Sequence, residues 1–399
     1  MAKTTGALFS LTASGMIGPR LTYSKRKSGG VCRIQKAQVS ITTEAQENVR
    51  KRYTDAYTDW NLLTTAEKEI FNARATGEMS GFNLFVKETI KPETPIWREV
   101  KPAGESDKAW SSNALSNTGK YIICGLESGR IYLSTNYGET WNETKPAGEA
   151  DLTWKSCSMS GTGKYIVACV GTGRIYVSQN YGTTWAEVRP EGDVDKNWAK
   201  TAISKNGKYF LAGIDGGYLY GSSDYGLTWS RIKPAGSESS NWQLTAISTT
   251  GKYMLAGRYA GACYKSSDYG ATWTTTGITG NSSRNYRSSA ICESGQYQWA
   301  GASSGRLFKS IDYGATWEEV RPVTDADYSW WKINISFDGK IVLLAQAYPS
   351  AYISYDYGIT WGKVTPLGVD LATWNISGID RTGNKKILGK RIGRLYLAK

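Results

Sequence analysis

The sequence predicts a mainly β protein, in which a small α+β domain precedes a seven-bladed β-propeller closed by pairing of its N- and C-terminal strands. Two observations predict this fold. Tryptophan recurs at intervals of 44 residues over three quarters of the chain, and each interval holds four short runs of strand-forming residues divided by glycine-bearing turns. Four strands in about 44 residues are typical of one propeller blade. The 44 Gly, 16 Trp and 26 Tyr among 399 residues suit such a chain, because turns need glycine and strands favour aromatic rings.

Two aromatic series set the register of the repeat, and no insertion or deletion interrupts either of them. In the first repeat we expect strands at residues 110–116, 121–124, 130–134 and 140–144. The glycine-bearing turns between them leave no room for a helix of about ten residues, which excludes a helical solenoid. The first series is Trp97, Trp141, Trp185, Trp229, Trp273, Trp317 and Trp361. The second series is Trp110, Trp154, Trp198, Trp242, Tyr286, Trp330 and Trp374.

The two ends of the repeat region complete each other. The sequence stops at Lys399, after the third strand of the last repeat, whereas residues 96–100 form a lone fourth strand before the first complete repeat. Three strands from one end and one from the other make the seventh blade. We therefore expect the ends to pair, which removes an open sheet edge on which other chains can aggregate.

An octapeptide, Ser-x-Asp-x-Gly-x-Thr-Trp, leads into six tryptophans of the first series, with Asn in place of Asp in two copies. It resembles the Asp-box, the repeat of bacterial neuraminidases that also occurs in other propellers. We expect the Asp or Asn side chain to accept backbone N–H groups across the turn between the third and fourth strands, while Gly supplies an unusual backbone shape and Trp packs between blades. A ring of cation-binding carboxylates is the alternative. The recurring residues are Ser134, Asn136, Gly138, Trp141, Ser178, Asn180, Gly182, Trp185, Ser222, Asp224, Gly226, Trp229, Ser266, Asp268, Gly270, Trp273, Ser310, Asp312, Gly314, Trp317, Ser354, Asp356, Gly358 and Trp361.

Charge and rare residue types limit the chemistry. The formal net charge of +13 is spread along the chain, and histidine is absent from the sequence. This absence excludes Ser-His and Cys-His nucleophile pairs, an imidazole base and His-ligated zinc. The six cysteines lack CxxC spacing and are expected to be free thiols. We therefore expect no cofactor and no metal site.

The resemblance to neuraminidases raises the question of catalysis. It implies three arginines around a substrate carboxylate, a Tyr–Glu nucleophile pair, an acidic Asp and an N-terminal Arg-Ile-Pro sequence. The last is missing here, and Arg130, Arg174, Arg306 and Arg394 share one repeated position before the third strand, as turn residues do. A non-enzymatic protein is therefore predicted. Because paired carboxylates can meet in space without any sequence pattern, a sialidase-like glycan-processing enzyme is the alternative.

Binding is predicted in the loops that join the fourth strand of one repeat to the first strand of the next. These loops vary most, and they gather on one face of a rigid ring. Aromatic rings beside polar loops suit contact with a sugar or a protein. The alternative is that the tryptophans start the innermost strands and pack between blades. The candidate binding residues are Asp107, Lys108, Trp110, Asp195, Lys196 and Trp198.

Residues 1–90 lie outside the repeat and are predicted to form the small α+β domain, followed by a linker at 91–95 and the propeller at 96–399. We expect strands at 7–12, 17–24 and 31–39, a basic hairpin at 25–30, and helices at 44–63 and 65–76, the second opened by a capping box. The segments Ser-Gly-Met-Ile-Gly (14–18), Glu-Ala-Gln (44–46), Trp-Asn-Leu-Leu-Thr (60–64) and Ser-Gly-Phe-Asn-Leu-Phe (80–85) resemble small domains of phage virion proteins. The resemblance implies a module that anchors to the particle and displays the propeller outwards.

The function expected from these patterns is that of a phage virion structural protein, decorating the capsid, collar or tail. It would bind other virion proteins through residues 1–90 and a host-surface glycan or protein through the propeller loops. An intracellular scaffold or assembly factor is an alternative. Nucleic-acid binding through Lys25, Arg26 and Lys27 is disfavoured, since so short a basic run is common on surfaces. Neither a membrane span of about 18 apolar residues nor a secretory signal is apparent, so we expect synthesis in the host cytoplasm and assembly into the virion.

Overall fold

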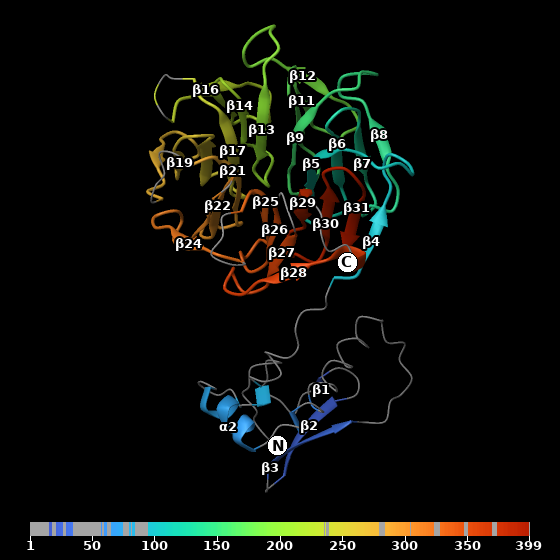
Figure 1. Cartoon of the computed structure of the whole chain (residues 1–399), viewed down its shortest axis with the longest axis vertical. Coiled ribbons are helices and arrows are strands. Elements are labelled where there is room, and N and C mark those ends of the chain that lie inside the picture. The colour runs from blue at the N-terminus through green and yellow to red at the C-terminus, as the bar shows by residue number, and fades with distance from the viewer. Residues whose placement is uncertain are drawn as a thin grey trace. The chain divides into compact units, whose positions relative to one another are not determined.

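The computed structural model describes residues 16–17, 21–26, 29–34, 57, 60–61, 65–74, 80, 82–83 and 95–398, apart from 235, 237–238, 279–283, 304, 323–327, 347–349 and 369–372. The chain divides into two compact units, Met1–Thr94 and Pro95–Lys399. The second unit holds seven four-stranded antiparallel sheets, arranged as the blades of a ring (Figure 1). This confirms the predicted seven-bladed propeller.

Each blade repeats the same order of strands from the axis outwards. The innermost strands are β5 (Trp110–Leu115), β9 (Trp154–Met159), β13 (Trp198–Ile203), β17 (Trp242–Ile247), β21 (Tyr286–Ile291), β25 (Trp330–Ile335) and β29 (Trp374–Ile379). The second strands are β6 (Ile122–Leu126), β10 (Ile166–Val170), β14 (Phe210–Ile214), β18 (Met254–Arg258), β22 (Gln298–Ala302), β26 (Val342–Gln346) and β30 (Lys386–Lys390). The third strands are β7 (Ile131–Ser134), β11 (Ile175–Ser178), β15 (Leu219–Ser222), β19 (Cys263–Ser266), β23 (Leu307–Ser310), β27 (Ala351–Ser354) and β31 (Leu395–Ala398). The outermost are β8 (Asn142–Thr144), β12 (Ala186–Val188), β16 (Ser230–Ile232), β20 (Thr274–Thr275), β24 (Glu318–Val320), β28 (Gly362–Val364) and β4 (Trp97–Val100), and a short 3-10 turn, η3 (Pro366–Gly368), follows β28.

The ring closes through the seventh blade, whose strand order is β29-β30-β31-β4. Strand β4 comes from the start of the propeller and pairs antiparallel with β31, from Val100 opposite Leu395 to Trp97 opposite Ala398. The closure predicted from the two incomplete ends of the repeat is confirmed. Consequently the last blade is held to the first by the chain itself as well as by packing.

The hydrophobic core lies between neighbouring blades. The second aromatic series starts the innermost strands, and its rings are 0–2% exposed. The Trp154 indole N–H, for example, donates to the Gly129 carbonyl of the preceding blade at 3.0 Å. Cys124 and Cys263 fill small apolar positions in these cores, and burial raises the pKa of the Cys263 thiol to about 12. The two thiols are therefore packing groups in this fold.

The octapeptide forms the turn between the third and fourth strands, as its fourth copy illustrates. The Ser266 hydroxyl donates to Asp268 Oδ1 at 2.7 Å and accepts the Gly270 N–H at 2.9 Å. Asp268 Oδ1 also accepts the Thr272 N–H at 2.9 Å, and the Trp273 indole donates to the Gly270 carbonyl at 3.0 Å. The side-chain polar groups of Ser266, Asp268 and Trp273 thus have partners within the turn itself.

A tyrosine that the repeat analysis left unassigned also belongs to this turn. Tyr225 has a φ of 66°, in the left-handed region that few non-glycine residues adopt. Its N–H donates to the Lys208 carbonyl at 3.1 Å, and its ring lies 5.0 Å from the ring of Tyr165 in the preceding blade. Contacts between blades therefore accompany the strained backbone. The same conformation, with φ of 61–66°, recurs at Tyr137, Tyr181, Tyr269, Tyr313 and Tyr357.

Replacing Asp268 by alanine is expected to lower the free energy of unfolding by about 1–2 kcal/mol, since the N–H and O–H groups that it accepts lose their partner. Hydrogen bonds from the Thr272 side chain and backbone lower the pKa of Asp268. Because the folded pKa lies below the unfolded value of about 3.9, this contribution is complete above that pH and is lost as the pH falls through the folded pKa. Asp268→Asn should retain most of the stability at neutral pH, because two copies of the turn already use Asn. Chemical denaturation at pH 7 and pH 3 measures both effects, and equal losses for the two variants at pH 7 would contradict the assigned role.

In the first unit, β1 (Met16–Ile17), β2 (Leu21–Arg26) and β3 (Gly29–Ile34) form an antiparallel sheet, and α2 spans Thr65–Arg74. The predicted strand at 17–24 is divided, since Gly18 and Pro19 separate β1 from β2 in sequence and proline cannot donate to a sheet ladder. Strands β2 and β3 reach further towards the hairpin tip than predicted, to Arg26 opposite Gly29. The predicted strand at 7–12, most of the helix at 44–63 and the linker up to residue 94 lie outside the described residues.

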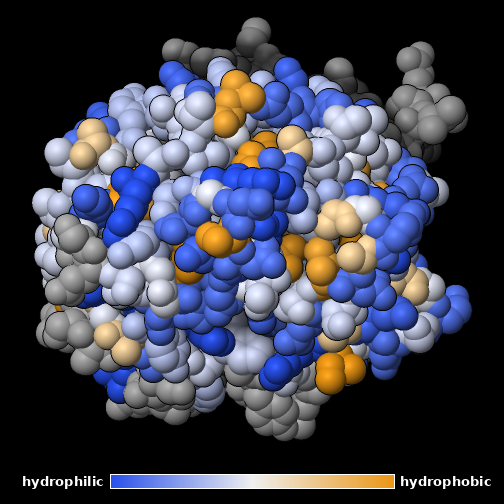
Figure 2. Space-filling view, turned by 90° about the horizontal axis from the view of Figure 1, so that it is seen from above, coloured by the Kyte–Doolittle hydropathy of each residue, from blue (hydrophilic) through white to orange (hydrophobic). Residues whose placement is uncertain are grey.

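The surface drawn in Figure 2 shows apolar side chains as small separate patches among hydrophilic ones. Among the helices that the structure describes, none combines the length and the apolar character needed to cross a membrane.

Candidate functional site

A pocket of about 350 Å³ is encircled by all seven blades of the propeller. Each innermost strand contributes the residue that directly follows its buried aromatic ring. The seven residues at this position therefore form a ring around the propeller axis, and each blade supplies a different side chain. Its residues are Ser111, Lys155, Ala199, Gln243, Arg287, Trp331 and Asn375.

Two further repeat positions reach the same pocket. Lys200 and Lys332 come one residue later on their innermost strands, where other blades carry Ser, Leu or Ile. Glu127, Asp215 and Arg391 occupy the turn after the second strand, at positions again separated by multiples of 44. The pocket is thus built where the repeat changes from blade to blade, on strands whose backbone does not.

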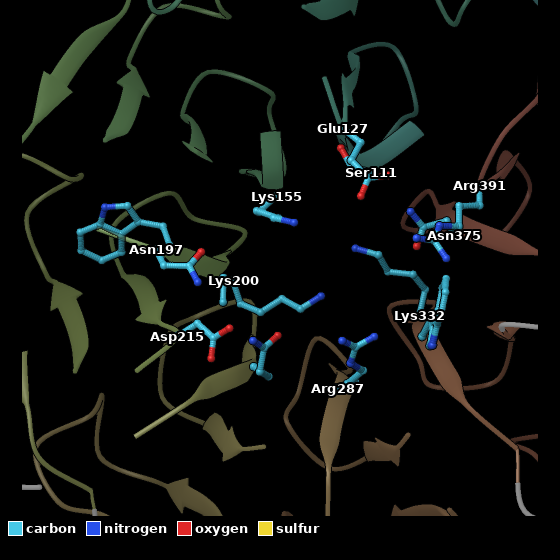
Figure 3. Close-up of a pocket in the computed structure, with 14 residues that line it drawn as sticks. Ser111, Glu127, Lys155, Asn197, Lys200, Asp215, Arg287, Lys332, Asn375 and Arg391 are labelled. Atoms are coloured by element: carbon cyan, nitrogen blue, oxygen red, sulfur yellow. The ribbon is translucent and has the colours of Figure 1, made fainter. Parts of the chain in front are cut away.

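The charge of the pocket is strongly positive. Lys155, Lys200, Arg287, Lys332 and Arg391 line it, against the two carboxylates Glu127 and Asp215. Figure 3 shows the side chains of Lys155, Lys200 and Lys332 reaching towards its middle from different blades. Within the described part of the chain, none of the five cationic side chains forms an ion pair or donates a side-chain hydrogen bond.

The repeated arginines elsewhere in the propeller form ion pairs. Arg130 Nε lies 2.7 Å from Asp151, and Arg174 Nε lies 2.8 Å from Asp195. The fold therefore supplies carboxylate partners for the repeated arginines, whereas the arginines of the pocket have none among the described residues. Unpaired cations facing one another raise the electrostatic potential of a cavity, which favours an anionic ligand.

Trp331 holds two of the pocket arginines in place. The Arg287 guanidinium lies 5.9 Å from the Trp331 ring centroid, and the Arg391 guanidinium lies 5.7 Å from it. Cation–π contact of this kind orients a guanidinium without neutralising it. The Arg287 Nε is buried and has no hydrogen-bond partner among the described residues. A donor of this kind is left for a ligand or for water.

The cations of the pocket repel one another. Burial and then the positive charges of Lys332 and Arg287 lower the pKa of Lys200 well below its usual value. Burial likewise lowers the pKa of Lys332. Both lysines are half-buried at the pocket surface, so part of this repulsion is screened by water. An anion placed between them would favour their charged forms.

At the opposite end of the innermost strands, the blades are linked by an ion pair and by backbone hydrogen bonds. Arg381 forms an ion pair with Glu293 at 2.8 Å, and its guanidinium lies 4.5 Å from the Phe337 ring centroid. Backbone hydrogen bonds link the first turns of neighbouring blades there, including one from the Arg381 N–H to the Asn117 carbonyl at 2.9 Å. This end therefore contributes to closure, and the cationic pocket is the candidate functional site.

The residues predicted to form binding loops lie in contacts between neighbouring blades. Asp107 forms an ion pair with Arg394 at 2.7 Å, and the Trp110 indole donates to the Gly393 carbonyl at 3.1 Å. The backbones of Lys108 and Lys196 form bridges to glycines of the preceding blade. Asp195 pairs with Arg174 as described above, and both Trp110 and Trp198 are 2% exposed. Trp198 nevertheless contributes to the pocket wall, directly before Ala199. Binding by the remaining loop residues stays a prediction.

Most of the pocket differs from the site predicted from the sequence, because binding was expected in the loops. The signal lay in the strands, at the residue after the second aromatic series, where a strict repeat carries seven different side chains. Metal binding has no comparable support, since the described residues include no group of three Cys, Asp or Glu side chains placed to hold an ion. The octapeptide carboxylates are occupied by hydrogen bonds within their own turns.

Comparison with solved structures identifies the same fold. Neither protein-family profiles nor curated proteins match the sequence. YCF48 bound to D1 peptide is similar with a TM-score of 0.58 and 12% identity, over 77% of this chain and 99% of that chain. The β-propeller domain of Myceliophteria thermophila Cps50 (Swd1) has a TM-score of 0.58 and 11% identity, over 75% and 99%. An ancestral GH74 enzyme has a TM-score of 0.59 and 17% identity, over 76% of this chain and 46% of that chain. At these identities the similarity shows a shared β-propeller fold and nothing finer.

Proposed function

We propose that this chain is a non-enzymatic binding protein, whose propeller presents the cationic pocket to an acidic ligand. The observation that carries the proposal is the set of five cations at the centre of an otherwise regular ring, none of which forms an ion pair with a described residue. A rigid scaffold that leaves charges unpaired in a cavity is organised for binding before the ligand arrives. The acidic ligand belongs to a glycan or a protein of the host surface.

The proposal includes attachment of the chain to a phage virion through residues 1–90, with the propeller displayed outwards on the capsid, collar or tail. Its support is the resemblance of four short segments in that region to small domains of virion proteins. The division of the chain into two compact units at Thr94 is compatible with an anchor and a displayed module. Each part of the proposal is tested separately.

Quantitative mass spectrometry of purified particles tests the location. We expect the chain in stoichiometric ratio to a structural protein of the particle, unchanged after a density-gradient step. Detection only in the lysate of infected cells would favour the alternative, an intracellular scaffold or assembly factor. The likeness to YCF48, which is bound to a peptide in the solved structure, gives that alternative a specific reason.

A glycan-processing activity is the second candidate, because Glu127 and Asp215 line the same pocket and an ancestral GH74 enzyme shares the fold. Glycosidases use such pairs of carboxylates. We expect purified protein incubated with host envelope polysaccharide to release no more reducing ends than the double variant Glu127→Gln, Asp215→Asn. Release by the unaltered chain that the double variant lacks would establish the enzyme and overturn the binding-only proposal.

A further inference from the structure

We propose that the pocket binds the phosphate group of a small phosphate monoester with a polar, uncharged body, such as a sugar phosphate. Lys200, Arg287 and Lys332 are its phosphate-binding residues. This inference rests on the proposed function, because it names the class of acidic ligand that the cationic pocket takes. The ligand occurs free in solution or as the terminal unit of a surface polymer.

The three binding residues come from blades three, five and six and face one cavity. In Figure 3 the Lys200 and Lys332 side chains extend towards each other, and the Arg287 guanidinium lies beside them. The Arg287 Nε is a buried donor without a partner among the described residues, and Trp331 lies against its guanidinium. A planar guanidinium and two ammonium groups together match the several oxygens of a phosphate better than the two oxygens of a carboxylate.

The charge balance also favours a dianion. Three cations meet at this place without an ion pair to any described residue, and a monoanion would leave most of their mutual repulsion in place. Burial, and then the positive charges of Lys332 and Arg287, lower the pKa of Lys200, in agreement with this arrangement of the three side chains. A phosphate monoester carries nearly two negative charges at neutral pH. It therefore neutralises the group more completely than a carboxylate does.

The remaining lining selects the body of the ligand. Asn197 and Gln243 offer amide groups, whereas Glu127 and Asp215 would repel a second acidic group. A body rich in hydroxyl groups and without further charge fits this mixture. The volume of about 350 Å³ is near the lower end of the range for small-ligand pockets, which suits one sugar unit at a time.

Isothermal titration calorimetry of the full chain tests the inference in a phosphate-free buffer of constant ionic strength. The probes are glucose 6-phosphate, inorganic phosphate and gluconate, a carboxylate of similar size. We expect one site per chain for both phosphates, with gluconate weaker by about tenfold or more, since one charge-assisted contact fewer is equivalent to that factor. Glucose 6-phosphate should bind more tightly than inorganic phosphate, and equal affinities would remove the assigned role of the sugar body.

Lys200→Met and Lys332→Met should each weaken glucose 6-phosphate binding by about tenfold or more, because the aliphatic stem is kept and only the charge is lost. Lys164→Met is the matched control, since this exposed lysine lies over the Tyr165 ring, outside the pocket, and its loss should change the affinity less than twofold. Thermal unfolding verifies that each variant is folded. If either pocket variant unfolds, Lys155→Met at the exposed part of the pocket takes its place, with the same expected direction.

The outcomes separate this inference from the function on which it rests. Equal binding of gluconate and glucose 6-phosphate overturns the phosphate assignment but leaves an acidic-ligand pocket. If neither phosphate binds but a glutamate decapeptide does, the phosphate assignment is likewise overturned and the acidic-ligand pocket remains. Failure of all three probes and of the decapeptide overturns the acidic-ligand function as well. Unchanged affinity in every pocket variant places any phosphate site elsewhere.

Discussion

Replacing Leu395 by alanine is expected to lower the free energy of unfolding by about 2–5 kcal/mol, the range for a fully buried leucine that cannot be replaced by repacking. Leu395 is 0% exposed and lies opposite Val100, in the strand pair that closes the ring. Its side chain belongs to the core between the last and the first blades, with Trp110 and Ile376. A cavity there weakens the one junction at which blades from the two ends of the propeller meet.

Two controls isolate the effect of closure. Ile392→Ala, three residues earlier and 72% exposed, should change stability by less than about 0.5 kcal/mol. Leu307→Ala, at the equivalent buried position of the fifth blade, should cost about as much as Leu395→Ala. Hydrogen exchange then distinguishes the two buried sites, because only Leu395→Ala should accelerate exchange in β4. Equal protection of β4 in both variants would contradict a closure held by this core.

The architecture was predictable because it depends on residues that recur. An indole every 44 residues must be buried somewhere, and turn residues at fixed offsets leave one way to bury all of them, between identical blades. The predicted strand at residues 130–134 became β7, which spans Ile131–Ser134, because the turn chemistry before it fixes where pairing begins. Closure of the ring was predictable for the same reason, because the last repeat has only three strands and the lone strand before the first repeat completes its blade.

The pocket was harder to predict because it depends on residues that do not recur. Nothing in the local sequence around Lys200 or Lys332 distinguishes a strand residue that faces the axis from one that faces a neighbouring blade. The register with β14 shifts between Trp198 and Lys200, as it does at the start of the innermost strand in other blades, and this shift helps to decide which side chains reach the pocket. Such a shift depends on tertiary packing at the start of the strand, and neither alternation nor propensity encodes it. The sequence shows that these strand positions vary from blade to blade. Only the three-dimensional structure shows that their side chains meet in one pocket.

The six tyrosines with a left-handed backbone conformation are a second feature that could not be predicted from the sequence. At Tyr137 and its five equivalents, the residue type alone disfavours a φ near 64°. At the five equivalents, contact with a tyrosine ring of the preceding blade accompanies this conformation, as in the Tyr121–Tyr181 pair with ring centroids 5.0 Å apart, whereas Lys385 lies over the Tyr137 ring. A backbone conformation that is unfavourable for tyrosine therefore occurs together with a contact between residues 60 positions apart, which the local sequence does not reveal.

Replacing Gly358 by alanine is expected to destabilise the propeller by about 2–5 kcal/mol, the sum of a left-handed backbone and overpacking. Gly358 has a φ of +79°, and a Cβ at this position would lie 2.3 Å from Cη2 of Trp299. The Trp299 ring is 0% exposed and packs edge-on against Trp361, with centroids 5.9 Å apart, so it has no space into which to move. Relief would require separation of the fifth and sixth blades.

Gly192 provides the matched comparison, since its φ of +78° is nearly the same but nothing lies within 4 Å of its Cβ position. Gly192→Ala should therefore lower the free energy of unfolding by about 1–2 kcal/mol, the cost of the left-handed backbone alone. Gly270, at the octapeptide position equivalent to Gly358, would place its Cβ 3.2 Å from Met254 Sδ. Because a methionine side chain adapts readily, Gly270→Ala should fall between the other two variants. Equilibrium urea unfolding of the three variants gives this order directly. If Gly358→Ala proved no worse than Gly192→Ala, the tight contact between Gly358 and Trp299 would not limit stability, and the glycine of the octapeptide would serve the turn conformation alone.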